Sequence, residues 1–305
     1  MSAPLLVFTT AYRAGLPFLG AFLAGLARQD DADFELVMAL DDVNEDEVAP
    51  YVATAAADLA GRTRLLRDSG HEDPVELRVA VLRGVLPGTQ GVVLVDSDDV
   101  PLPGRVAAAR AALASADVAA CAMELLDDAG APSGGRFEAG AFASWPELLS
   151  GCNVVGFGNA AYRSETLLAA LPSEEGVRLL DWLVAVRALA AGARLAFDAT
   201  PRLGYRLHRG SMAGVRRPFS AEQVQRAVPL VAGHHARLLA PRLPRHALPP
   251  TLQALVEAAR DDLVAFRAQV VDDPRALRRY VTALNADGRI YRWWEWLRDW
   301  RQRIS

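Results

Sequence analysis

The chain is poor in the features that mark several large protein classes. It has only two cysteines in 305 residues, Cys121 and Cys152. Two cysteines cannot make a disulfide framework, and their spacing is not that of a CxxC metal site, so we expect reduced, buried thiols. Neither a signal peptide nor an apolar stretch long enough to span a membrane is visible. These absences predict a cytoplasmic protein.

An excess of positive charge and the common phosphate-binding motifs are missing as well. The 33 Lys and Arg residues are outnumbered by 37 Asp and Glu residues, for a net charge of −4, which gives no support to a nucleic-acid partner. Neither GxGxxG nor GxxxxGK[ST] occurs, so dinucleotide-binding and P-loop interpretations have no basis. The segment 156–158 (Gly-Phe-Gly) lacks the third glycine and is predicted to be a turn.

The most informative segment that is present covers residues 92–101. Four apolar residues, of which three are β-branched, run directly into Asp96, Ser97, Asp98 and Asp99. Such an apolar run is typical of a buried parallel strand, and open α/β sheets bind ligands at the carboxyl ends of their strands. Clustered carboxylates there suit a hard divalent cation that also binds phosphate. The alternative is a turn or helix cap, since Asp and Ser favour both.

Strand and helix patterns alternate through the first hundred residues. This alternation predicts an α/β fold with a mostly parallel, doubly wound sheet. Strands are expected at 4–9, 34–40 and 64–67, and helices at 15–28, 45–60 and 73–86. Further on we expect a helix at 105–114, a strand at 118–123, a polar loop at 127–136, a strand at 153–157, a helix at 178–191, and short strands at 194–197 and 203–207. Helices separated by proline-rich hinges follow from residue 220, so the predicted division is a catalytic domain at 1–218 and a helical region at 219–305.

Polar residues follow three of the predicted strands, and in a parallel sheet those strand ends share one edge. Such a constellation can hold a nucleotide: the base stacks near Tyr12, an aspartate accepts a hydrogen bond from a base N–H or a ribose hydroxyl, and a metal ion holds the diphosphate. The residues predicted to bind the nucleotide are Thr9, Thr10, Ala11, Tyr12, Arg13, Asp41, Asp42, Arg78, Asp96 and Ser97.

Three later features add candidates. Asp181 lies in a strongly apolar helix, where partial burial would raise its pKa and make it a general base; alternatively it is a first-turn acid favoured by the helix dipole. His208, between two arginines, is either a metal or phosphate ligand or a surface residue. A loop at 209–217 that carries Arg216 and Arg217 could close over a diphosphate.

The last segment of interest is rich in tryptophan. At helical spacing, Trp293, Trp296, Leu297 and Trp300 share one face, which predicts a terminal helix docked on the body or on a second subunit of a homodimer. Peripheral membrane contact is the alternative, although Glu295 and Asp299 disfavour it. The remaining histidines that we considered, His234, His235 and His246, have no suitably spaced partners and are predicted to lie on the surface.

Taken together, these blocks resemble the family 2 glycosyltransferases, which have the GT-A fold. Residues 7–13 and 36–42 stand where that family has Pro-Thr-Tyr-Asn and Val-Val-Asp-Asp, and 93–101 is similar to its Leu-Asp-Ser-Asp-Asp-x-x-x-Pro block with the DxD motif. Residues 180–182 look like its Glu-Asp-Trp, and 205–211 like its Tyr-Arg-x-His-x-x-Ser. The sequence departs from the pattern at Ala11, Arg13 and Leu180.

The resemblance implies a Rossmann-like, mostly parallel sheet flanked by helices, with a C-terminal helical extension. It implies a metal-dependent inverting glycosyltransferase of the hexosyltransferase type, which takes a nucleotide-diphosphate sugar, UDP-linked first of all, and transfers the sugar to an acceptor hydroxyl. Mg²⁺ or Mn²⁺ would bind Asp98, assisted by Asp99 and His208, and Asp181 would be the base. Trp145, Trp182 and the 127–136 loop are the acceptor candidates. The competing interpretations are a nucleotidyltransferase of the same fold and a nucleotide-sugar-binding module without turnover.

Overall fold

The computed structural model describes residues 4–55, 57–67, 70–207 and 213–304. The chain forms two compact units that interleave along the sequence. The first comprises Met1–Arg136, Val155–Glu175 and Ala193–His208; the second comprises Phe137–Val154, Gly176–Gly192 and Arg209–Ser305. The compact units therefore do not follow the expected division at residue 218, because two internal segments pack with the C-terminal helices.

The first unit is built on a mixed sheet, most of whose described strands run parallel. Its strand order is β3-β2-β1-β4-β8-β6-β9-β5, with β7 paired to β6. The parallel part at one end consists of β1 (Leu5–Tyr12), β2 (Phe34–Asp41), β3 (Thr63–Arg67) and β4 (Gly91–Leu94). The rest consists of β5 (Val100–Pro101), β6 (Val118–Leu126), β7 (Pro132–Phe137), β8 (Ala160–Arg163) and β9 (Leu195–Arg206).

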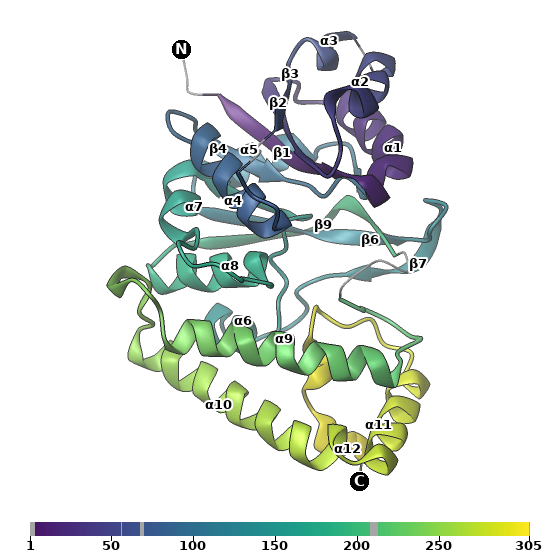
Figure 1. Cartoon of the computed structure of the whole chain (residues 1–305), viewed down its shortest axis with the longest axis vertical. Coiled ribbons are helices and arrows are strands. Elements are labelled where there is room, and N and C mark those ends of the chain that lie inside the picture. The colour runs from purple at the N-terminus through teal and green to yellow at the C-terminus, as the bar shows by residue number, and fades with distance from the viewer. Residues whose placement is uncertain (1–3, 56, 68–69, 208–212, 305) are drawn as a thin grey trace. The chain divides into compact units, whose positions relative to one another are not determined.

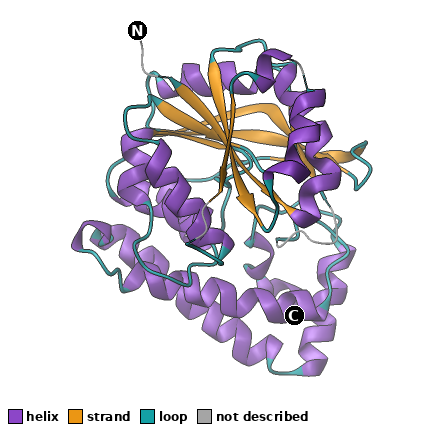
Figure 2. Cartoon of the chain, turned by 45° about the horizontal axis from the view of Figure 1, so that its top comes forward, coloured by secondary structure: helices purple, strands orange, loops and turns teal. Residues whose placement is uncertain are grey.

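Helices flank this sheet, as Figure 2 shows. They are α1 (Leu16–Ala27), α2 (Glu45–Thr54), α3 (Ala57–Ala60), α4 (Pro74–Val85), α5 (Arg105–Leu113) and α7 (Ser164–Ala170), with a short 3₁₀ turn at Arg13–Gly15. Local chemistry explains their starts. Asp73 accepts hydrogen bonds from the backbone N–H groups of Val75 and Glu76, and Pro74 occupies the first turn, so α4 begins where the sequence predicts. The expected α/β architecture of a mostly parallel sheet flanked by helices is confirmed.

The second unit is helical in its described residues. It contains α6 (Trp145–Gly151), α8 (Leu180–Ala190), α9 (Ala221–Leu239), α10 (Pro250–Phe266), a π-helical segment at Arg267–Val271, α11 (Pro274–Ala286) and α12 (Trp300–Ile304), with 3₁₀ turns at Pro244–His246 and Glu295–Leu297. α9 and α10 run alongside each other (Figure 1). Among the described residues, no helix combines the length and apolar character needed to cross a membrane.

Several sequence expectations differ from the observed elements. The 127–136 region is not simply a loop, because β7 begins at Pro132 and pairs with β6. The segment 153–157 forms only one isolated bridge, from Asn153 to Trp293. The two short strands expected at 194–197 and 203–207 are one strand, β9, with an irregular register beside β6. The helix expected at 45–60 is broken into α2 and α3.

The tryptophan-rich tail is not the single helix that its periodicity predicts. Trp294 and Asp299 adopt left-handed backbone conformations with φ of 68° and 52°, which interrupt a right-handed helix. The side chains of Trp293, Trp294, Trp296, Leu297 and Trp300 are nonetheless all buried. The tail is thus docked, and its tryptophans do not form an exposed apolar face.

Candidate functional site

The parallel strands bring the polar strand ends to one edge of the sheet. Tyr12, the last residue of β1, lies in register with Asp41, the last residue of β2. On the other side of β1, Phe8 pairs with Leu94, so the acidic run that follows β4 begins at the same edge. The register of the sheet therefore brings Tyr12, Asp41 and the acidic run to one edge, which is the arrangement that the sequence predicts.

The acidic run is tied to β1 by two side-chain hydrogen bonds. The Tyr12 hydroxyl donates to Oδ2 of Asp98 at 3.0 Å, and the buried Ser97 hydroxyl donates to the backbone oxygen of Thr10 at 2.7 Å. Burial, followed by the charge of Asp98, raises the pKa of Tyr12, so the phenol stays protonated and remains a donor. The Asp98 carboxylate is therefore held in a defined orientation.

Negative charge is crowded around Asp98. Burial raises the pKa of Asp96; the nearby Arg78 guanidinium opposes this effect and the Asp98 carboxylate adds to it. Asp99 is 1% exposed, and its pKa is raised well above the ordinary value, first by burial and then by the charges of Asp98 and Asp96. Its Oδ1 accepts the Arg206 backbone N–H at 2.8 Å, whereas its buried Oδ2 has no partner among the described groups. A cation at this cluster would relieve both the repulsion and the unsatisfied oxygen.

A glycine lies directly against two of these carboxylates. A Cβ atom built on Gly158 would be 3.0 Å from Oδ2 of Asp99 and 3.4 Å from Oδ2 of Asp96. The missing side chain thus leaves space beside the carboxylate oxygens. The segment 156–158, predicted to be merely a turn, is part of the wall of the site.

Arg78 projects from α4 toward the same edge. Its Nε donates to Oγ1 of Thr10 at 3.1 Å, and its Nη2 lies 3.6 Å from Oδ1 of Asp96. The guanidinium also lies over the Phe157 ring, 5.5 Å from the centroid. Thr9, Thr10, Arg78, Asp96 and Phe157 are among the residues that line a narrow gap at the strand ends, which is too small to hold a water molecule. An arginine guanidinium at this edge of the sheet is suited to binding phosphate oxygens.

The other predicted nucleotide-binding residues divide into buried and exposed groups. Thr9 and Ala11 are each 1% exposed and belong to the sheet interior. Arg13 is exposed, and its guanidinium donates to Glu47 Oε1 and to the Asp42 backbone oxygen, each at 2.7 Å. Asp42 has a left-handed φ of 52°, and burial raises the pKa of its neighbour Asp41.

The residues fit a divalent cation that is shared with a ligand. Among the described residues, no three His, Cys, Asp or Glu side chains converge into a complete metal centre. Mg²⁺ commonly uses one or two carboxylates and completes its octahedron with water and substrate phosphates. Asp96, Asp98 and the unsatisfied Oδ2 of Asp99 offer carboxylate oxygens of the kind that such a site uses.

In the helical unit, Asp181 occupies the first turn of α8 and is partly exposed. Its Oδ2 accepts a hydrogen bond from Nδ2 of Asn153 at 3.1 Å. Arg216 is partly buried and Arg217 is exposed. His208, predicted to bind metal or diphosphate, lies outside the described residues, as do 209–212 of the predicted closing loop.

Several side chains lie deeper than expected. His234, His235 and His246 are 4%, 2% and 4% exposed, so the prediction that they are surface residues is wrong. His234 stacks on Trp182, with ring centroids 4.2 Å apart. Trp182 itself is fully buried, which leaves it no face for an acceptor. Both cysteines are free and buried, as predicted.

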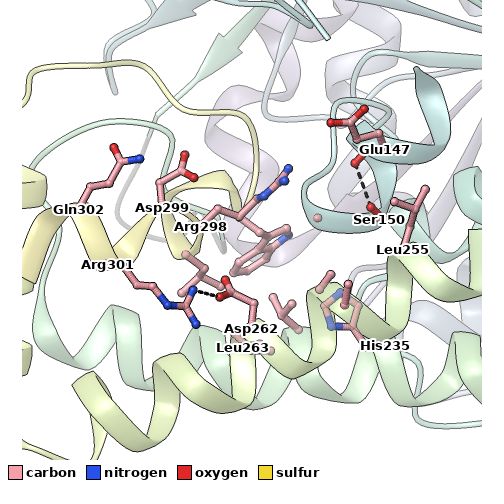
Figure 3. A pocket seen from close by; sticks show the side chains of 16 residues that line it. Glu147, Ser150, His235, Leu255, Asp262, Leu263, Arg298, Asp299, Arg301 and Gln302 are labelled. Atoms are coloured by element: carbon pink, nitrogen blue, oxygen red, sulfur yellow. Dashed lines mark hydrogen bonds and ion pairs between the residues drawn. The ribbon is translucent and has the colours of Figure 1, made fainter. Parts of the chain in front are cut away.

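The helical unit also contains a pocket of about 520 Å³. α6, α9, α10 and residues 294–302 line it, with His235, Arg298 and Leu263 among the side chains (Figure 3). The ion pair between Asp262 and Arg301 lies on its wall. Of the residues predicted to bind donor, metal or acceptor, none that the structure describes lines this pocket, so its volume alone does not identify the functional site.

Three residues at these sites were missed by sequence reasoning. Gly158 lies against the carboxylates, Arg206 donates from Nε to the Asp98 backbone oxygen at 2.8 Å, and Asn153 contacts Asp181. Arg206 stands within the Tyr-Arg-x-His block, so the resemblance already marked its position. For Gly158 and Asn153 the only sequence signal was their place between two better recognised blocks.

Comparisons with known proteins identify the architecture. No protein-family model and no curated sequence matches the chain. Among solved structures, a mannosyltransferase from Pyrobaculum calidifontis in complex with GDP-Man and Mn²⁺ aligns with a TM-score of 0.60 and 17% identity over 95% of this chain and 77% of its own. TarS 1–349 from S. aureus in complex with UDP-GlcNAc aligns with a TM-score of 0.55 and 15% identity over 99% of this chain and 90% of its own. GalNAc-T7 with UDP, GalNAc and Mn²⁺ aligns with a TM-score of 0.54 and 13% identity over 88% of this chain and 57% of its own.

In another structure of TarS, the match covers 93% of this chain but 44% of that protein's chain. This chain therefore spans less than half of that TarS chain. The aligned proteins share a mixed, largely parallel sheet flanked by helices with the chain described above. This chain has the GT-A glycosyltransferase fold.

Proposed function

We propose that the chain is a metal-dependent inverting glycosyltransferase that moves a sugar from a nucleotide-diphosphate donor to an acceptor hydroxyl. The observation that carries the proposal is the carboxylate cluster at the end of β4, held by Tyr12 and Ser97 and flanked by Arg78. Similar folds in complex with UDP-GlcNAc and with GDP-Man and Mn²⁺ support this class of ligand. UDP-sugars and GDP-sugars are accordingly the first donors to test.

Asp96 and Asp98 would hold the cation, with Asp99 behind them. A divalent cation at this position offsets the charge of the departing diphosphate. Arg78 would neutralise a further phosphate charge, while the polar groups at the ends of β1 and β2 hold the nucleoside. Arg216 and Arg217 would approach the diphosphate from the loop that carries them, and closure would limit hydrolysis of the donor by excluding water.

Asp181 is the proposed general base. Its carboxylate would take the proton of the acceptor hydroxyl as that oxygen attacks the anomeric carbon on the face opposite the diphosphate. General-base assistance of this kind contributes about 10²–10⁴-fold to the rate. Inversion of the anomeric configuration follows from a single displacement.

A thermal shift measurement against UDP, GDP, CDP and ADP, each with and without Mn²⁺, tests the donor site. We expect one nucleotide to raise the melting temperature only when Mn²⁺ is present, and Asp98→Ala to abolish that response. Asp98→Ala leaves the backbone oxygen that Arg206 binds, so it removes the carboxylate alone. A nucleotide response without Mn²⁺ dependence would contradict the metal site.

Measurement of transfer separates the alternatives. With the nucleotide sugar that the thermal shift selects, Asp181→Asn should still bind nucleotide but lose transfer to the acceptor. Full transfer in that variant would refute the assignment of the base. Binding without any turnover in the natural chain would favour the non-catalytic module, and release of pyrophosphate from a nucleoside triphosphate would favour the nucleotidyltransferase.

A further inference from the structure

Asn153 is a wholly buried polar residue whose backbone is bonded on both sides. It is 0% exposed. Its backbone N–H donates to the Trp293 oxygen at 2.9 Å, and the Trp293 N–H donates to the Asn153 oxygen at 3.1 Å. The isolated bridge between the two residues therefore fixes the backbone position of Asn153 relative to the C-terminal segment.

The side chain of Asn153 connects this bridge to the first turn of α8. Its Nδ2 donates to Oδ2 of Asp181. The next residue, Trp182, donates from Nε1 to the backbone oxygen of Leu149, at 2.7 Å. Two successive residues of α8 are thus tied to the segment 149–153, and the stacking of Trp182 on His234 limits rotation of the helix.

The C-terminal side of the bridge is itself well anchored. The ring of Trp293 packs on Phe137 with centroids 4.3 Å apart. Arg292 donates to the Ala139 oxygen at 2.9 Å and forms an ion pair with Glu295 at 2.6 Å. These contacts make the strand-like segment around Trp293 a fixed support.

We propose that Asn153 is a positioning residue for the Asp181 carboxylate, with the C-terminal Trp293 segment as its support. The inference rests on the proposed role of Asp181 as the general base. The helix dipole alone would favour an acid in the first turn of α8 but would not orient its carboxylate. An amide donor directed at one carboxylate oxygen does orient it.

A double-mutant cycle tests this proposal in the chain of residues 1–305. We expect Asn153→Ala to lower kcat by about 10²-fold with little change in the KM for the donor, because a displaced catalytic group costs that much without affecting donor contacts. In the Asp181→Asn background, the same substitution should change the residual transfer less than twofold, because Asn153 acts through Asp181. Independent, multiplicative effects of the two substitutions would overturn the proposal.

A matched control separates positioning from stability. Asn285 lies in the same unit, and its amide bonds the N–H and C=O of Phe219, at 2.7 and 2.9 Å. Asn285→Ala should lower the melting temperature. It should change the rate of transfer by the same factor in the natural chain and in the Asp181→Asn background. If Asn153→Ala does not fold, Asn153→Asp keeps the side-chain volume and removes the donor; an unchanged kcat in that variant would overturn the proposal.

The two proposals fail in different ways. Full transfer by Asp181→Asn would refute the base itself. Loss of transfer in Asp181→Asn, together with an unchanged kcat in folded Asn153→Ala, would refute only the positioning role. The Mn²⁺-dependent nucleotide response should persist in every Asn153 variant, because the carboxylate cluster at β4 does not include it.

Discussion

Substitution of Gly158 by alanine tests whether the space beside the carboxylates matters for binding. The added Cβ would lie 3.0 Å from Oδ2 of Asp99, and ordinary contact begins at 3.4 Å, so that carboxylate must move by about 0.4 Å. The φ of Gly158 is not among the left-handed values, so alanine fits the backbone. The substitution should therefore perturb the site and leave the fold intact.

The expected loss can be estimated. Binding constellations need their groups within about 0.5 Å of the productive geometry, and this displacement uses most of that tolerance, so we expect the nucleotide–Mn²⁺ complex to weaken by roughly tenfold, or about 1.4 kcal/mol. At a nucleotide concentration about 100 times the original Kd, stabilisation falls from about 2.7 to about 1.4 kcal/mol. With an unfolding entropy of about 2.1 cal/mol/K per residue over 305 residues, the ligand-induced shift in Tm falls from about 4 °C to about 2 °C.

The assay is a thermal shift titration with Mn²⁺ and the selected nucleoside diphosphate. Gly20→Ala in α1 is the matched control, because a Cβ there meets nothing within 4 Å. It should raise the stability of the helix by about 0.5–1 kcal/mol and leave the nucleotide response unchanged. A Gly158→Ala variant with the full 4 °C shift would refute the reasoning.

Three further outcomes follow from buried groups. Because burial raises the pKa of Asp99, the folded state holds a proton that the unfolded state releases, and stability falls as pH rises above about 4. Without metal, Asp99→Asn should therefore have a higher melting temperature than the natural chain at pH 8, and the two melting temperatures should converge by pH 4. A difference in melting temperature that does not change with pH would contradict this. Burial lowers the pKa of His235 to about 4, so protonation of the unfolded state should lower the free energy of unfolding of the natural chain by up to about 3 kcal/mol between pH 7 and pH 4. His235→Gln should not show this loss, and urea unfolding at each pH measures it. Trp296→Ala should cost about 3–5 kcal/mol because the ring is fully buried, whereas anionic vesicles should leave the tryptophan fluorescence of the natural chain unchanged.

Local signals located most elements of the first hundred residues. The strands β1, β2 and β4 are largely buried apolar runs, and Asp73 marks the start of α4. The strand β3 is only partly buried, and no local signal predicted the break between α2 and α3. The strand β8 (Ala160–Arg163) was missed because its short Ala-Ala-Tyr-Arg segment has little intrinsic preference for a strand and becomes one through pairing with β4 and β6. The tail was predicted as a helix because tryptophan spacing reports which side chains are buried and not the backbone turn at Trp294.

The acids of the candidate site could be predicted for a related reason. Asp96 and Asp98 follow a strand that the sequence marks clearly, and strand ends in a parallel sheet meet at one edge. Gly158 and Asn153 depend on contacts between residues far apart in the chain, which no local pattern reports. The same limit applies to the compact units, since the periodicity of α8 does not reveal which helices it packs against.

The order in which the chain is synthesised determines when the bridge between Asn153 and Trp293 can form. A ribosome completes Asp181 and Asn153 more than a hundred residues before the segment that supports them. All the strands around the carboxylate cluster precede residue 207 and emerge earlier. On the proposed roles of the carboxylate cluster and of Asp181, a nascent chain would therefore form its nucleotide site before the segment around Trp293 can support its base.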